Sequence, residues 1–422
     1  MQPLIPDYLS GVLRDCGGDR SGALADYIPE LAHVEPERFG MALATVDGAV
    51  YCAGDSDIEF TAQSISKPFA YALALEDLGL DEVLAKIDVE PSGDPFNDLS
   101  LEAGTGRPLN PMINAGALAT HALLERGGSV GARVDRVIAG LSAFAGRQLS
   151  VDETVYESEL QTAYRNRALA NMLRSLDNFE VEPLDVVRGY TRQCAVQVTT
   201  RDLAMMAATL ANGGVQPATG EQVISRSVVR QVLSVMTTCG MYDSAGDWLS
   251  TVGIPAKSGV SGGLLGVLPG QSGIATFSPR LDKHGNSVRG VLAFQQCSDE
   301  LGLHLMEVAP ATRTVVRDQR EITADGEVVE VFELHGTIQF AGAERLVRSL
   351  VEDAPKISHV VFDLTEVYAM NTVAGSMLRR SARILVSEGR RVTFVDPANI
   401  AAATPDGGPL RVVDTLEDVL AG

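Results

Sequence analysis

A serine and a lysine lie three positions apart in the string Ser64-Ile65-Ser66-Lys67, at the start of a predicted helix. Residues at this spacing share one helix face, so the amine of Lys67 can reach the hydroxyl of Ser64. A serine hydroxyl is a weak nucleophile until a base takes its proton, and a desolvated lysine with a lowered pKa can be that base. The tetrapeptide therefore indicates covalent catalysis by Ser64. On its own it also fits an ordinary helix start with an exposed lysine.

A second motif, Lys257-Ser258-Gly259, precedes a glycine-rich apolar stretch. Penicillin-binding proteins and serine β-lactamases combine an S-x-x-K nucleophile motif with a comparable K-T-G strand. A small residue in that strand lets a substrate lie beside the strand edge, whose N–H groups can bind an oxyanion. No histidine lies near either motif, and S-x-x-K catalysis requires none. The two motifs together favour an acyl-transfer enzyme in which Lys257, Ser258 and Gly259 support the site.

From about residue 26 to residue 304 the chain resembles the serine-dependent glutaminases of bacteria and mitochondria, because a series of motifs appears in that family's order. The string Gln63-Ser64-Ile65-Ser66-Lys67-Pro68 closely resembles the corresponding motif of that family. The others are Tyr27-Ile28-Pro29, Met112-Ile113-Asn114-Ala115-Gly116-Ala117, Ser158-Glu159 with Arg165-Asn166, Tyr190 through Cys194, Leu210-Ala211-Asn212-Gly213-Gly214, Cys239-Gly240-Met241-Tyr242-Asp243, and Pro255 through Gly263.

The resemblance implies a β-lactamase-like α/β fold, in which a helical lobe packs against a mixed α/β lobe with the active site between them. It also implies an amidohydrolase that converts L-glutamine to L-glutamate and ammonia through an acyl-enzyme. Ser64 would attack the side-chain amide carbon, and Lys67 would receive or relay the proton. Tyr242 would take part in proton transfer, and Tyr27 would be a second phenol near the nucleophile. The N–H groups of Ser64 and Val260 would form the oxyanion hole.

The same resemblance implies a binding site for the amino-acid end of the substrate. Glu159 would accept the ammonium group, and Asn114, Asn166 and Tyr190 would donate to the carboxylate, which suits a zwitterion. Gln63 would also contact the substrate, together with Ser64, Tyr242 and Val260. If their segment is one helix, Glu159 and Asn166 share a face. Taken singly, Asn114 could satisfy a turn, Tyr190 could be a core phenol and Glu159 a solvated helix residue.

Composition limits the partners and the compartment. The formal net charge of −21 disfavours nucleic acid or a membrane surface as a partner, since either would need a basic face. The five cysteines are scattered without a C-x-x-C pair, and the six histidines show no metal-ligand spacing. We therefore expect no metal, no cofactor and no disulfide framework. The N-terminus resembles no signal peptide and no apolar window is long enough to span a bilayer, so we expect a cytoplasmic protein.

Local patterns predict the elements that position the motifs. They predict a hairpin over residues 39–51 that turns at Asp47-Gly48, a helix over 64–78 with Pro68 in its first turns, and a helix that begins at Thr199 or Thr200 and ends at Gly213. They also predict strands over 274–277 and 288–294 around a turn at Lys283-His284-Gly285. Together these elements indicate one antiparallel sheet flanked by helices.

A second domain is predicted at the C-terminus. We expect a catalytic domain over residues 1–308, a polar linker over 309–326 and a small α/β domain over 327–422. Its expected strands are 328–334, 359–364 and 391–396, and its expected helices are 341–351 and 372–388. The stretch from Asp363 to Ala374 resembles the STAS fold of anti-sigma factor antagonists. Thr372 then lies where those proteins carry a phosphorylatable serine, although Asn371 replaces their aspartate.

The second domain has two interpretations, a regulatory domain with a protein partner and a degenerate docking domain that aids assembly. In both, the chain is expected to be a homo-oligomer, a dimer or a tetramer. Two rival functions also remain. A penicillin-binding or β-lactamase-type acyltransferase would need a middle S-x-N or Y-x-N motif, which is not convincingly placed. A signalling adaptor on an inactive hydrolase scaffold would not need Ser64, Lys67, Tyr242 and Lys257, which are all present.

Overall fold

A computed structural model describes residues 4–93, 98–125, 127–307, 315–324, 327–352, 357–400 and 410–420. The chain divides into two compact units, Leu9–Gln296 and a smaller unit of Met1–Tyr8 with Cys297–Gly422. Helices α1 (Ile5–Cys16) and α12 (Val288–Leu301) each cross this division. In the part of the chain that the structure describes, no helix combines the length and the apolar character needed to cross a membrane.

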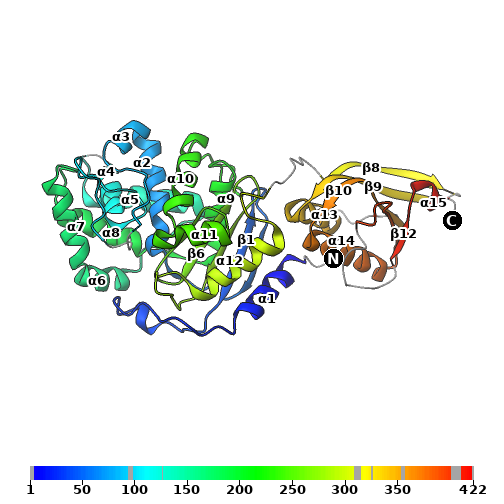
Figure 1. Cartoon of the computed structure of the whole chain (residues 1–422), viewed down its shortest axis with the longest axis horizontal. Coiled ribbons are helices and arrows are strands. Elements are labelled where there is room, and N and C mark those ends of the chain that lie inside the picture. The colour runs from blue at the N-terminus through cyan, green and yellow to red at the C-terminus, as the bar shows by residue number, and fades with distance from the viewer. Residues whose placement is uncertain are drawn as a thin grey trace. The chain divides into compact units, whose positions relative to one another are not determined.

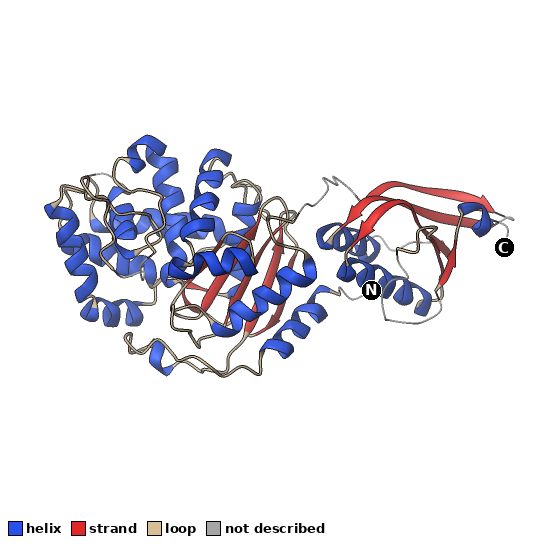
Figure 2. Cartoon of the chain, viewed as in Figure 1, coloured by secondary structure: helices blue, strands red, loops and turns tan. Residues whose placement is uncertain are grey.

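The larger unit is built on a five-stranded antiparallel sheet of order β2-β1-β7-β6-β5 (Figures 1 and 2). Its strands are β1 (Gly40–Thr45), β2 (Val50–Gly54), β5 (Ala256–Ser258), β6 (Gly263–Leu268) and β7 (Ser272–Phe277). The predicted hairpin is confirmed, since β1 and β2 pair from Gly40↔Gly54 to Ala44↔Val50. The predicted arrangement of one antiparallel sheet flanked by helices is also confirmed.

Two glycines let helices approach the two faces of this sheet. A Cβ on Gly273 would lie 2.3 Å from the Ala204 carbonyl oxygen in helix α9 (Thr200–Ala211). A Cβ on Gly266 would lie 2.5 Å from the ring of Phe294 in α12, on the opposite face. As predicted, α9 begins at a threonine cap: Thr199 and Asp202 form a reciprocal capping box, and the helix ends just before Gly213.

The remaining helices form a layered lobe that covers the α9 side of the sheet (Figure 1). They are α2 (Ser66–Leu78), α3 (Leu80–Leu84), α4 (Asn114–Leu123), α5 (Val130–Ala145), α6 (Glu153–Thr162), α7 (Tyr164–Ser175), α8 (Pro183–Cys194) and α10 (Arg226–Cys239). Helix α11 (Ala245–Thr251), the short 3₁₀ turns η1 (Leu31–His33), η2 (Gln63–Ile65) and η3 (Tyr242–Ser244), and the two-stranded sheet of β3 (Phe60–Thr61) and β4 (Gln197–Val198) complete the unit.

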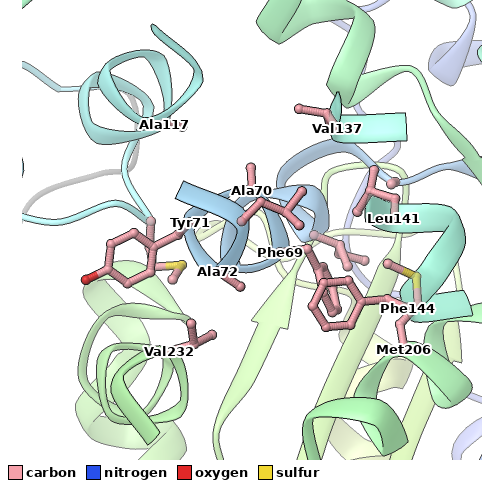
Figure 3. Close-up of a cluster of buried hydrophobic side chains, with 14 of the residues drawn as sticks. Phe69, Ala70, Tyr71, Ala72, Ala117, Val137, Leu141, Phe144, Met206 and Val232 are labelled. Atoms are coloured by element: carbon pink, nitrogen blue, oxygen red, sulfur yellow. The ribbon is translucent and has the colours of Figure 1, made fainter. Parts of the chain in front are cut away.

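Helix α2 runs through the middle of the hydrophobic core (Figure 3). Every residue from 66 to 75 is buried, which is typical of a helix surrounded by protein on all sides. The ring of Phe69 meets the ring of Phe144 edge-on at 4.9 Å, and Tyr71 packs near Val232 on another side of the helix. Pro68 falls in the first turn, where its missing N–H group breaks no helical hydrogen bond. The helix that carries Lys67 is therefore held rigidly.

One strand prediction in this unit is wrong. Residues 288–294 were expected to form a strand, but they belong to helix α12. The buried residues Ala293, Phe294, Cys297 and Leu301 recur at helical spacing, and only the first two fall inside the predicted segment. A short apolar run cannot be assigned to strand or helix by periodicity until its continuation is counted.

The smaller unit has a five-stranded sheet of order β12-β11-β10-β9-β8, in which all neighbours are parallel except β8 and β9. Its elements are β8 (Val316–Ala324), β9 (Glu327–Ile338), α13 (Phe340–Glu352), β10 (His359–Met370), α14 (Thr372–Ser387), β11 (Arg391–Val395), β12 (Arg411–Val413) and α15 (Leu416–Leu420). The alternating strands and helices predicted for this region are confirmed. Its STAS-like identity stays a prediction.

The predicted linker requires a correction. It was placed at residues 309–326, but β8 occupies Val316–Ala324 and pairs along β9. This strand is at the sheet edge and residues 317–321 are exposed, so its sequence is polar and lacks the alternation of a half-buried strand. Residues 309–314, 325 and 326 lie outside the described residues.

Candidate active site

Side chains from several elements of the larger unit meet at one cavity of about 170 Å³. Its lining consists of Tyr27, Ile28, Gln63, Ser64, Asn114, Glu159, Thr162, Ala163, Arg165, Asn166, Tyr190, Cys194 and Val260. Every residue predicted to contact the substrate belongs to this lining except Tyr242, which is hydrogen-bonded to Ser64. The side chain of Tyr27 lies at the cavity and is 53% exposed.

Ser64 lies in a strained turn rather than in the α-helix expected for it. The 3₁₀ turn η2 precedes α2, and within it Gln63 has φ +49°, in the left-handed region. Side chains with a Cβ rarely adopt this conformation, and it persists where the surrounding structure holds it. The hydroxyl of Ser66 donates to the Gln63 carbonyl oxygen at 2.8 Å. This turn presents Ser64 at the cavity wall.

The amine of Lys67 is enclosed by oxygen atoms in the core of the unit. Its Nζ donates to the Met112 carbonyl oxygen at 3.0 Å and to Asn114 Oδ1 at 2.7 Å, and it lies 3.5 Å from the Tyr242 hydroxyl. Burial lowers the pKa of Lys67 to about 7. A neutral amine has two N–H donors, which the Met112 and Asn114 oxygens accept, and one lone pair, which is left for the Tyr242 side.

Tyr242 lies between two buried lysines. Its ring centroid is 3.9 Å from Lys257 Nζ and 5.4 Å from Lys67 Nζ. Burial lowers the pKa of Lys257 well below its ordinary value, and the Lys67 charge lowers it further. Burial raises the pKa of Tyr242, and the hydrogen bond with Ser64 opposes that rise. Tyr242 also has φ +56°, so the site contains a second residue held in the left-handed region.

The Lys257-Ser258-Gly259 motif packs closely against the turn that holds Ser64. A Cβ on Gly259 would lie 2.9 Å from the Ala62 carbonyl oxygen and 3.1 Å from Ile65 Cγ1, so a larger residue would push the strand away. Beyond the motif, Ser261 Oγ donates to the Thr61 carbonyl oxygen at 2.7 Å. These contacts place Val260 at the cavity beside Ser64.

Glu159 belongs to the cavity lining and is hydrogen-bonded to the turn that holds Ser64. Gln63 Nε2 donates to Glu159 Oε2 at 3.1 Å and to Thr61 Oγ1 at 3.3 Å. Burial raises the pKa of Glu159 to about 7, while the Gln63 hydrogen bond and the Lys67 charge lower it. Glu159 and Asn166 do not lie on one helix, because α6 ends at Thr162 and α7 begins at Tyr164, so the condition for a shared helix face is not met. Both side chains still reach the cavity.

Amide and phenol groups complete the lining. Asn114 is the first residue of α4, and its Nδ2 donates to Asn166 Oδ1 at 3.1 Å while its Oδ1 accepts from Lys67. Tyr190 and Cys194 lie one turn apart on α8 and are hydrogen-bonded to each other. Burial raises the pKa of both groups, so both stay protonated near neutral pH.

The cavity also contains residues that were not predicted, namely Ile28, Thr162, Ala163, Arg165 and Cys194. Two of these had a usable signal. Arg165 precedes Asn166 in the same family-like string, and Cys194 follows Tyr190 at i+4 spacing, which places the two on one helix face. Thr372 lies in the other unit as the first residue of α14, after the Asn371 side chain that caps the helix. Among the described residues, no group of three or more His, Cys, Asp or Glu side chains could hold a metal ion.

Comparisons with known proteins identify the family of the chain. The family model described as Glutaminase matches residues 22–306. A glutaminase of Corynebacterium glutamicum is 50% identical over 397 residues, covering 94% of this chain and 95% of its own, and that of Corynebacterium efficiens is 46% identical over 94% and 93%.

Among solved structures, a crystal structure of Mglu is 48% identical and covers 95% of this chain and 100% of its own with a TM-score of 0.72. A structure of Mglu in its glutamate form is 44% identical, with the same coverage and TM-score. The family match covers most of the chain, and the curated relatives match it almost end to end. The chain therefore belongs to the glutaminase family and is a hydrolytic enzyme of that family.

Proposed function

We propose that the chain hydrolyses the side-chain amide of L-glutamine through an acyl-enzyme on Ser64. The single observation that carries the proposal is the buried Lys67 amine, which has both N–H donors directed at carbonyl oxygens and Tyr242 on its remaining side. Burial of this amine lowers its pKa to about 7 and favours a neutral lysine, whose lone pair then faces Tyr242 and can accept a proton. Kinship with glutaminases and the likeness to Mglu in its glutamate form support the choice of substrate.

The proton path follows the hydrogen bonds of the site. Ser64 attacks the amide carbon and gives its proton to Tyr242 as Tyr242 passes its own to Lys67. The proton on Lys67 then returns along this path to the departing nitrogen, which leaves as ammonia. Water hydrolyses the resulting ester by the reverse path and releases glutamate. Lys257 packs against the Tyr242 ring, with Nζ 3.9 Å from the ring centroid and donating to the Ser258 carbonyl oxygen, and so helps to hold the phenol in place.

The remaining groups bind the reacting oxygen and the amino-acid end. The N–H groups of Ser64 and Val260 form the oxyanion hole, and the contacts of Gly259 and Ser261 with the turn before Ser64 fix their spacing. The carboxylate of Glu159 accepts the substrate ammonium. The Asn114, Asn166 and Tyr190 side chains bind the substrate carboxylate, and Gln63 and Tyr27 close the cavity around it.

Replacing Ser64 by alanine tests the nucleophile. We expect Ser64→Ala to lower kcat by roughly 10⁴-fold or more, because no other group can form the ester. The measurement is ammonia release from purified protein whose thermal unfolding matches the parent. Ser250→Ala, which removes an exposed serine of α11, is the matched control and should keep full activity. A folded Ser64→Ala protein with more than a few per cent of parental turnover would contradict the assignment.

Replacing Glu159 by glutamine tests recognition of the ammonium. Glutamine at this position can still accept from Gln63, so the change removes mainly the charge. A charge-assisted bond that becomes neutral costs about 1–3 kcal/mol, so kcat/KM should fall by roughly 5- to 150-fold, mostly through KM. Glu157→Gln, an exposed position on the same helix, is the control. Unchanged steady-state kinetics for Glu159→Gln would remove this carboxylate from the site.

The pH profile follows from the two shifted groups. Lys67 has a lowered pKa of about 7, so its neutral, basic form increases as pH rises through 7. Glu159 has a raised pKa of about 7, so its carboxylate also forms over that range. We therefore expect kcat/KM to rise with pH through about 7. In Glu159→Gln, kcat should still rise over this range, because Lys67 still loses its proton there. Activity that is highest near pH 5 would contradict a lysine base.

For the smaller unit we propose a regulatory, STAS-like role, in which Thr372 accepts a phosphate. Through this role the unit would bind a protein partner or promote self-assembly. Thr372 is the first residue of a 16-residue helix, where the N–H groups favour a phosphate. Every residue with a proposed catalytic role lies in Leu9–Gln296. The unit would thus tune a cytoplasmic homo-oligomeric enzyme rather than supply chemistry.

A truncated chain tests this division of labour. Residues 1–307 contain the whole larger unit and both helices that cross the division, so we expect them to fold and to retain glutamine hydrolysis within about 10-fold of the full chain. Specific activity and solution mass of both proteins are compared at equal concentration. A monodisperse truncated protein with no turnover would show that the smaller unit is needed for catalysis.

A further inference from the structure

A line of buried hydrogen bonds runs behind the nucleophile turn through residues with no assigned role. His121 Nδ1 lies 3.1 Å from Gln193 Oε1, and Gln193 Nε2 donates to Ser66 Oγ at 3.1 Å. Ser66 Oγ then donates to the Gln63 carbonyl oxygen at 2.8 Å. All four side chains are nearly inaccessible to solvent. The line joins helices α4, α8 and α2 to the turn that holds Ser64.

Its direction is set by the chemistry of the groups. The Gln63 carbonyl can only accept, so Ser66 gives it the hydroxyl proton and must accept from Gln193 through its NH₂ group. The amide oxygen of Gln193 then faces His121, which must carry its proton on Nδ1. Each hydrogen bond of the line therefore has one donor and one acceptor. If any of these side chains exchanged its donor for its acceptor, a hydrogen bond would be lost.

His121 is kept neutral at the far end. Within the described part of the chain its Nε2 has no hydrogen-bond partner, and a Cβ on Gly189 would lie 2.1 Å from that atom. Burial lowers the pKa of His121 to about 4, and the charge of Arg133 on α5 lowers it further. A second proton would place an N–H donor against Gly189 with nothing to accept it, so His121 holds the Nδ1–H tautomer across the working pH range.

The near end of the line is Gln63, one of the two strained residues of the site. Gln63 has φ +49°, and its side-chain amide binds Glu159 and Thr61. Its carbonyl also accepts the backbone N–H of Ser66, so two donors of one residue fix its orientation. A shift of this peptide would move both Ser64 and the amide that holds Glu159.

We propose that Ser66, Gln193 and His121 are positioning residues that hold the Gln63-Ser64 turn in its reactive conformation. The proposal rests on the roles assigned above to Ser64 and Glu159. It assigns these three residues no contact with the substrate. Because the line ends on Gln63, which precedes Ser64 and is hydrogen-bonded to Glu159, its loss should change kcat and KM together. The effect should decrease with distance from Gln63.

The test compares Ser66→Ala, Gln193→Leu and Gln193→Glu with the parent and with Thr209→Val. Thr209 is a buried hydroxyl of α9 that donates to the Phe144 carbonyl oxygen at 2.9 Å, away from the cavity lining. Its replacement should lower the melting temperature and leave kcat and KM unchanged. Gln193→Leu should lower kcat/KM by roughly 10- to 100-fold, and Ser66→Ala by more. If Ser66→Ala does not fold, Gln193→Leu still tests the proposal.

Gln193→Glu supplies a signature that loss of stability alone would not produce. A carboxylic acid at this position can donate to Ser66, but a carboxylate accepts the Ser66 proton and takes it from the Gln63 carbonyl. Burial raises the pKa of such an acid. The ratio of variant to parental kcat/KM should therefore increase as pH falls from 8 to 6, against the parental trend.

Native kcat and KM in both Gln193 variants, or a pH-independent ratio for Gln193→Glu, would overturn the proposal. Active Ser64→Ala would instead overturn the proposed function. The two failures are thus distinguishable.

Discussion

The site depends on a lysine side chain that is almost completely buried. Lys67 is 1% exposed and lies in a helix whose first ten residues are all inside the core. A protonated amine in such a place is costly, so burial lowers the pKa of Lys67 to about 7 and favours the neutral form that the proposed mechanism uses as its base. The other groups of the site follow from this requirement. Two carbonyl oxygens bind the N–H donors, and a phenol occupies the direction of the lone pair.

The architecture around Lys67 is correspondingly tight. The strand that carries Lys257 approaches the turn that holds Ser64 so closely that only glycine fits at position 259 without displacing a neighbour. Gln63 precedes Ser64 in the chain and Tyr242 is hydrogen-bonded to it, and both adopt left-handed backbone conformations. Such conformations persist only when the surrounding packing and hydrogen bonds determine them. The buried hydrogen bonds through Ser66 and Gln193 help to hold Gln63 in this conformation.

Much of this arrangement could be predicted from the sequence, and the exceptions have physical causes. The serine and lysine motifs have short, regular spacing. The family-like motifs predicted that Asn114, Glu159, Asn166 and Tyr190 lie at the site, and all four line the cavity. The strand predicted over residues 288–294 was wrong because a short apolar run does not distinguish strand periodicity from helix periodicity. Strand β8 was missed because an edge strand with exposed, polar side chains has the composition of a linker. His121 and Gln193 could not be foreseen at all, since their contact joins residues 72 positions apart on separate helices.

The central claim is that Ser64 becomes covalently acylated during turnover. The direct measurement is intact-protein and peptide mass spectrometry after acid quenching, within milliseconds, of the full chain mixed with saturating L-glutamine. The account predicts a fraction of chains heavier by one glutamyl group, with that group on the peptide containing Ser64 and absent from Ser64→Ala. Ammonia release at the full rate with every chain unmodified, or a glutamyl group on another residue, would contradict it.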